Sequence, residues 1–114
     1  MRIDIRHEGA VVVLDLDGKL TPGDSDILLY ETINRLLAEG RKQVLLNLEK
    51  VPYMDSAGIS QLVSCYKILS AAGGVVKLLN PLKRVYDVLQ LVKLNTLFEV
   101  HYEEPAAIAS FEQR

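Results

Sequence analysis

Residues 44–60 read VLLNLEKVPYMDSAGIS and contain the main change of pattern in this chain. Residues 44–48 are apolar except for Asn47, as is typical of a short strand that is buried on both faces of a sheet. A loop containing Pro52 follows, and from Ile59 onward the apolar residues recur at helical spacing. The stretch therefore predicts a central strand that leads through a short loop into a helix.

The segment before this stretch contains two strand patterns and one helix pattern. Ile3 and Ile5 alternate with charged residues, which indicates a half-buried strand, and residues 10–16 form the second strand of a predicted hairpin. The apolar side chains of residues 26–37 then fall on one face of a helix, and Gly40 supplies its C-terminal stop.

The segment after residue 60 continues the alternation of helix and strand. Gly73 and Gly74 end the second helix. The remaining predictions are a fourth strand, a short helix with Pro81 in its first turn, a fifth strand and a last helix opened by Pro105, at residues 75–79, 80–89, 98–102 and 105–111. This order predicts a single α/β domain over residues 1–114, with a mixed, mostly parallel five-stranded sheet and about four helices packed around it.

Composition and charge narrow the classes of function. The 114 residues are 49% apolar and 25% charged, which is typical of a globular domain. The net charge of −2 and the scattered cations argue against nucleic-acid binding, which favours a basic stripe. The single cysteine, Cys65, allows no internal disulfide and suits a reducing compartment, and no apolar run resembles a signal peptide or a membrane span. We therefore expect a cytoplasmic protein that does not insert into a membrane.

The candidate site is the pair Asp55 and Ser56, between the central strand and the second helix. Sites in open α/β sheets tend to lie beyond the carboxyl ends of the strands. On residue type alone, one of the two side chains merely caps the helix. A hydroxyl at this place also faces free backbone N–H groups and so tolerates a phosphate, which would add about −1.5 to −2 of charge beside Asp55. The residues by themselves leave both interpretations open.

The stretch from Leu46 to Ser60 resembles the signature of STAS domains, the family of the anti-sigma-factor antagonists. Within it, residues 55–58, DSAG, match the phosphoacceptor motif of the family, with Ser56 at the acceptor position. Residues 18–21, GKLT, resemble the loop that flanks that site in the family. The likeness covers about residues 3–103, and the predicted order of elements is also that of the family.

The resemblance implies a switch between partners. The unphosphorylated antagonist binds an anti-sigma factor that is also a serine kinase, and so frees a sigma factor. The kinase then uses ATP to phosphorylate Ser56, which breaks the complex, and a serine phosphatase resets the protein. Asp55 would shape and charge the site. The other residues expected to contact the partner are Thr21, Pro22, Gly23, Asp24, Ala57 and Gly58, and, on the exposed start of the second helix, Ser60, Gln61 and Ser64.

Two further roles within the family stay open. One is a scaffold subunit of a stress-signalling assembly, and the other is a cytoplasmic subunit of a lipid-transport ABC system. The intact Ser56 favours a phosphorylation switch over the lipid-transport role, but it does not separate an antagonist from a phosphorylated scaffold. For Ser60 and Ser64 the alternative is a plain solvent-facing helix surface. A monomer and a homodimer both fit the resemblance.

Enzymatic alternatives lack the residues they need. A hydrolase elbow requires Gly-x-Ser-x-Gly, whose first glycine is replaced by Met54, and a histidine base. His7 falls in the first predicted turn, and His101 is predicted to point to solvent from the last strand. A receiver domain phosphorylated on Asp55 would need an acidic pair after the first strand, which instead ends in Arg6-His7-Glu8. We expect no catalytic activity, no cofactor and no metal site.

Overall fold

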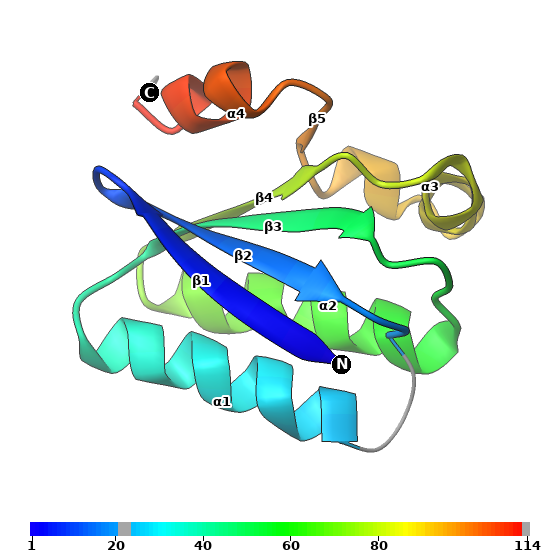
Figure 1. Ribbon diagram of the computed structural model, residues 1–114, viewed down its shortest axis with the longest axis horizontal. Coiled ribbons are helices and arrows are strands. Elements are labelled where there is room, and N and C mark those ends of the chain that lie inside the picture. The colour runs from blue at the N-terminus through cyan, green and yellow to red at the C-terminus, as the bar shows by residue number, and fades with distance from the viewer. Residues whose placement is uncertain (21–23, 113–114) are drawn as a thin grey trace.

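The computed structural model describes residues 1–20 and 24–112, which contain a five-stranded sheet in the order β1-β2-β3-β4-β5 (Figure 1). The strands are β1 (Arg2–Glu8), β2 (Val11–Asp17), β3 (Gln43–Lys50), β4 (Val75–Leu79) and β5 (Val100–His101). β1 pairs antiparallel with β2, and every later pairing is parallel. The structure thus confirms the mixed, mostly parallel sheet and the N-terminal hairpin.

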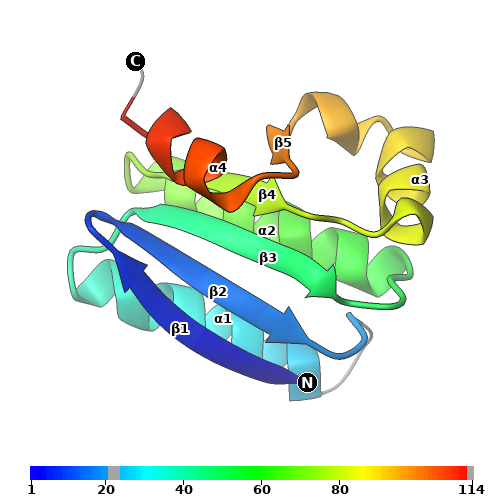
Figure 2. The same ribbon diagram turned by 45° about the horizontal axis from the view of Figure 1, so that its top comes forward.

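The helices cover the two faces of the sheet unequally. They are α1 (Asp24–Ala38), α2 (Ser56–Ala71), α3 (Lys83–Leu91) and α4 (Glu104–Ser110), with a short 3-10 turn at Leu94–Thr96. α1 and α2 lie side by side against one face, whereas the short α4 crosses the other (Figures 1 and 2). Among the described residues, no helix is long and apolar enough to cross a membrane.

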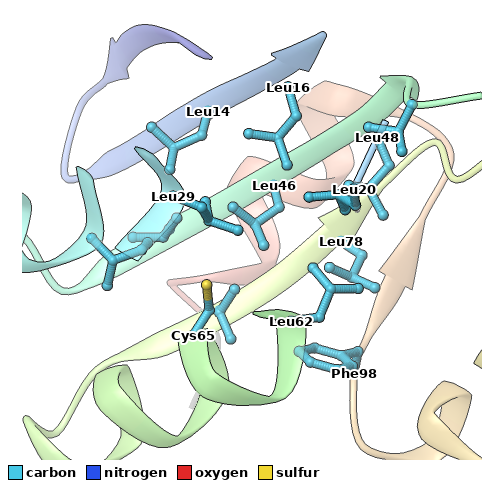
Figure 3. Close-up of a cluster of buried hydrophobic side chains, with 14 of the residues drawn as sticks. Leu14, Leu16, Leu20, Leu29, Leu46, Leu48, Leu62, Cys65, Leu78 and Phe98 are labelled. Carbon is cyan, nitrogen blue, oxygen red and sulfur yellow. The ribbon is translucent and has the colours of Figure 1, made fainter. Parts of the chain in front are cut away.

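Alternation along the strands divides the core into two layers. On β2, Leu14 and Leu16 pack toward α1 and α2, whereas Val11 and Val13 face α4. The larger layer joins strand residues such as Leu46 to side chains of both helices (Figure 3). This arrangement follows from the two-residue period of a strand that is buried on both faces.

Three predicted boundaries were wrong. His7 was predicted to lie in a turn, but β1 continues through it to Glu8. The fifth strand is only two residues long, and Phe98, which was predicted to belong to it, lies before it in the larger core layer, where its ring meets Tyr66 of α2 edge to face at 5.8 Å. Pro81 does not lie in the first turn of α3, whose N-cap is Leu82. Asn80 instead adopts φ 51°, a left-handed conformation that Asn tolerates, and turns the chain out of β4 before the helix begins.

Candidate functional site

Asp55, and not Ser56, caps α2. The Asp55 backbone is extended, and its Oδ1 atom accepts hydrogen bonds from the backbone N–H groups of Ala57 at 3.0 Å and Gly58 at 3.1 Å. Ser56 is the first residue of the helix and is exposed. The expected cap is therefore present, and it leaves the neighbouring hydroxyl at the surface beside a carboxylate.

The loop between β3 and α2 is anchored by two buried side chains. The N–H of Val51 donates to the carbonyl oxygen of Leu48 at 3.0 Å, and this turns the chain at the end of the strand. Val51 and Met54 are buried, whereas Pro52 and Tyr53 are exposed. The loop therefore holds the start of α2 against the core while it leaves one surface free around Ser56.

Residues 18–20 run beside this loop, as the sequence predicted. The N–H of Gly18 donates to the carbonyl oxygen of Lys50 at 3.1 Å, the N–H of Leu20 donates to that of Tyr53 at 3.2 Å, and an isolated parallel bridge joins Leu20 to Met54. Of the other residues expected in this loop, Thr21, Pro22 and Gly23 lie outside the described residues, and Asp24 is the first residue of α1.

Gly58 was expected at the contact surface, but it is buried. A Cβ atom at this position would lie 2.4 Å from the carbonyl oxygen of Leu20 and 2.5 Å from Cγ of Met54. The glycine therefore allows α2 to approach the bridge between the two loops. Its place in the motif has a packing reason, and it cannot touch a partner directly.

Gln61 was also expected to be exposed, and its exposed fraction is only 9%. The buried residues of α2 form one stripe at helical spacing: Gly58, Gln61, Leu62, Cys65 and Leu69. Gln61 falls on this stripe, so the helical period overrides the polar character of its side chain. Ser60 and Ser64 lie outside the stripe and are exposed, as predicted.

An open groove of ≈ 450 Å³ separates α1 from α2 and starts one residue from Ser56. It is lined by Leu29, Tyr30 and Ile33 of α1 and by Ala57, Ser60, Gln61, Ser64, Cys65 and Ile68 of α2. The contribution of α1 was missed in the sequence. Tyr30 is the corresponding signal, because this aromatic side chain directly follows the buried Leu29 and is 54% exposed. The surface beside Ser56 is therefore partly apolar and belongs to two helices.

A charged cluster on the opposite face of the sheet connects the first strands to α4. The Arg6 guanidinium donates to Asp15 at 2.6 and 3.0 Å and to Glu104 at 2.6 and 3.0 Å, and Asn47 donates to Asp15 at 2.8 Å. The hydrogen bonds from Arg6 lower the pKa of Asp15 and the pKa of Glu104 below their usual values. This cluster fastens α4 to the sheet.

His101 does not point to solvent as predicted. Its side chain is only 19% exposed, with Nε2 2.6 Å from Oε1 of Glu99 and 3.4 Å from Oγ of Ser110. It therefore contacts α4, the helix that lies on the face of the sheet opposite to α2. In the described part of the chain, no group of three or more His, Cys, Asp or Glu side chains could hold a metal ion.

Comparison with known proteins places this geometry in one family. The family model for the STAS domain matches residues 2–107. The chain is 22% identical over 102 residues to an anti-sigma F factor antagonist of Paenibacillus polymyxa. The aligned stretch covers 87% of each protein.

Solved structures give the same fold. The crystal structure of the Thermotoga maritima protein TM1081 superposes with a TM-score of 0.90 and 22% identity over 97% of this chain and 95% of that one. The anti-sigma factor antagonist SpoIIAA in its unphosphorylated form superposes with a TM-score of 0.73 and 20% identity over 99% of this chain and 100% of that one. With most of its length matched by the family model, the chain belongs to the STAS domain family.

Proposed function

We propose that this chain is a cytoplasmic anti-sigma-factor antagonist that is switched by phosphorylation of Ser56. In its unphosphorylated form it binds an anti-sigma factor with serine-kinase activity and so releases a sigma factor. The main observation in support of the proposal is that two adjacent residues at the start of α2 have different roles. Asp55 caps the helix, and Ser56 presents an exposed hydroxyl. The names of the relatives support it, since the Paenibacillus protein and SpoIIAA are both called anti-sigma factor antagonists.

The surroundings of Ser56 explain how a phosphate would act. The N–H groups of Ala57 and Gly58 already bind Asp55, so a phosphate on Ser56 would meet a carboxylate whose charge is held in place. About −1.5 to −2 of added charge would make this surface strongly anionic. A partner that packs against the start of α2 would then have to desolvate the phosphate or lose contact.

The contact surface of this proposal includes both helices. Ser60 and Ser64 are exposed along the rim of the groove, and Tyr30 faces them from α1. Apolar side chains at the centre of such a surface provide affinity, and the hydroxyl groups of the rim provide hydrogen bonds. The partner kinase supplies the ATP and a phosphatase removes the phosphate, so the chain itself needs no cofactor and performs no catalysis.

Calorimetric titration of the cognate anti-sigma kinase tests the switch. Ser56→Ala should bind like the unmodified protein, and Ser56→Asp should bind at least ~10-fold more weakly, since a carboxylate reproduces part of the added charge. Ser70→Ala and Ser70→Asp make the same chemical changes at an exposed position near the other end of α2, and should leave the affinity unchanged.

Two outcomes would contradict the proposal. Equal affinities for Ser56→Ala and Ser56→Asp would mean that charge at this position does not control the partner. Equal weakening by Ser56→Asp and Ser70→Asp would reveal a general charge effect, and would favour a scaffold or transport-subunit role in which the exposed hydroxyl has no switching function.

A further inference from the structure

β1 forms a long free edge of the sheet. It has seven residues, whereas β5 at the other edge has two. In the part of the chain that the structure describes, β1 lies at the edge of the sheet (Figure 2) and pairs only with β2, so one row of its backbone N–H and C=O groups faces outward. Such an edge can accept a further strand by backbone hydrogen bonding.

The side chains of β1 divide into an apolar and a charged face. Ile3 and Ile5 pack against the larger core layer. The residues on the other face are Arg2, Asp4, Arg6 and Glu8, so basic and acidic side chains alternate along this face. Charges on an edge usually discourage pairing with another strand, so their order determines which strand can be accepted.

This order is complementary to itself in one antiparallel alignment. When two copies of β1 run antiparallel with Ile5 opposite Ile5 of the second copy, Arg2 faces Glu8 and Asp4 faces Arg6, twice each by symmetry. All four cross-strand pairs then join opposite charges, which stabilise a sheet when they lie directly opposite. Ile3 faces His7 on the other side of the sheet.

Neighbouring alignments bring like charges together. Centring the pair on Asp4 places Asp4 against its own copy and Arg2 against Arg6. Centring it on Arg6 places Arg6 against its own copy and Asp4 against Glu8. Like charges directly opposite are destabilising, so the charge order selects the alignment centred on Ile5.

We propose that a second copy of this chain pairs with β1 in this alignment, which joins the two sheets into one in a symmetric homodimer. A two-fold axis at Ile5 makes the interface self-complementary, as in most homodimers. The side chains of Arg2 and Asp4 are 68% and 56% exposed, and the ion pair that they form with each other at 3.3 Å would be exchanged for pairs across the interface. Arg6 is already held in place by Asp15 and Glu104, so it loses little conformational freedom when it meets Asp4 of the second copy.

Charge-swap variants test the surface by sedimentation velocity across a concentration series. Arg2→Glu and Glu8→Arg each place like charges opposite one another twice, and each should raise the dimer dissociation constant at least ~10-fold. The double variant Arg2→Glu/Glu8→Arg restores opposite charges and should restore the dimer. Both side chains are largely exposed, so the monomers should stay folded, which circular dichroism checks.

Cysteine cross-linking tests the alignment. Ile5→Cys places a thiol opposite its own copy and should form a covalent dimer on mild oxidation. Ile3→Cys has the same chemistry on the same face, but it faces His7 and should cross-link at least ~10-fold more slowly. The unmodified protein is the background control, since its single thiol, Cys65, is buried.

Three results would overturn the proposal. The first is an unmodified protein that sediments as a monomer throughout the concentration series. The second is a double charge-swap variant no more dimeric than the single variants, and the third is Ile3→Cys cross-linking as fast as Ile5→Cys. None of these results depends on whether Ser56 is phosphorylated, so this proposal and the proposed function can fail separately.

Discussion

The Oδ1 atom of Asp55 lies 3.1 Å from the backbone nitrogen of Gly58 and fixes the first turn of α2. The bond brings a capping carboxylate and a buried glycine together on either side of an exposed hydroxyl. Asp55, Ser56 and Gly58 therefore have different physical roles, which variants at each position can distinguish.

Asp55→Ala should lower the free energy of unfolding by about 1 kcal/mol, because it removes the acceptor for two backbone N–H groups. Asp55→Asn keeps an oxygen acceptor at the same place and should retain most of the stability. Urea denaturation at pH 7 measures both variants. An Asn variant as unstable as the Ala variant would show that the carboxylate stabilises the fold by something other than capping.

Gly58→Ala should lower the free energy of unfolding by about 1–3 kcal/mol, because the new methyl group would overlap the carbonyl oxygen of Leu20. The same change inside an unconstrained helix would stabilise it by up to about 1 kcal/mol, so the sign of the effect is informative. Ser60→Ala, at an exposed position of the same helix, should stay within about 0.5 kcal/mol. Thermal denaturation that shows Gly58→Ala at least as stable as the unmodified protein would refute the close approach of α2.

Arg6→Met should make the protein less stable at pH 7 by about 1 kcal/mol, the upper range for partly exposed ion pairs. The pKa values of Asp15 and Glu104 are lowered from 3.8 and 4.5, so their contribution to stability is present above these values. It is lost as the pH falls through the lower pKa values of the folded protein. The difference in stability between the two proteins should therefore shrink on acidification.

Urea denaturation at pH 7 and at a series of acidic pH values measures this difference. Lys83→Met removes an exposed ion pair with Asp87 and serves as the matched control, with a pH profile like that of the unmodified protein. A difference between Arg6→Met and the unmodified protein that stays constant as the carboxylates are protonated would contradict the role given to this cluster.

Cys65 should react slowly with thiol reagents in the folded protein. Burial raises the pKa of its thiol to about 12, so the reactive thiolate is scarce at pH 8, although the residue lines the groove between α1 and α2. Colorimetric thiol titration should show a rate that rises at least ~100-fold in denaturant. Rapid modification under native conditions would mean that the groove between α1 and α2 opens far enough for the reagent to reach Cys65.

Local patterns in the sequence were sufficient for most of the architecture. The apolar run at residues 44–48 specified a strand buried on both faces, and the alternation of Ile3 and Ile5 specified a half-buried strand. The fifth strand was predicted too long, because residues 98–102 alternate throughout, whereas only Val100 and His101 form a strand. Short alternating segments do not show which residues pack against a helix and which pair with a strand.

The candidate site was predicted less completely than the fold. The exposure of Ser60 and Ser64 was predicted correctly, but the burial of Gln61 was not, although it falls on the same helical stripe as Cys65. The contribution of α1 to the groove, and the contact of Arg6 with a residue 98 positions away, depend on tertiary packing. No local period in the sequence contains that information.

The most direct test of the central claim is peptide mass spectrometry on the protein purified from its own host during growth and under stress. The account predicts a phosphate on Ser56 in a fraction of the molecules that changes between the two conditions. Fragment ions separate this position from the exposed serines nearby, Ser60 and Ser64. Unmodified Ser56 under both conditions, or a phosphate only on Ser60 or Ser64, would contradict the account.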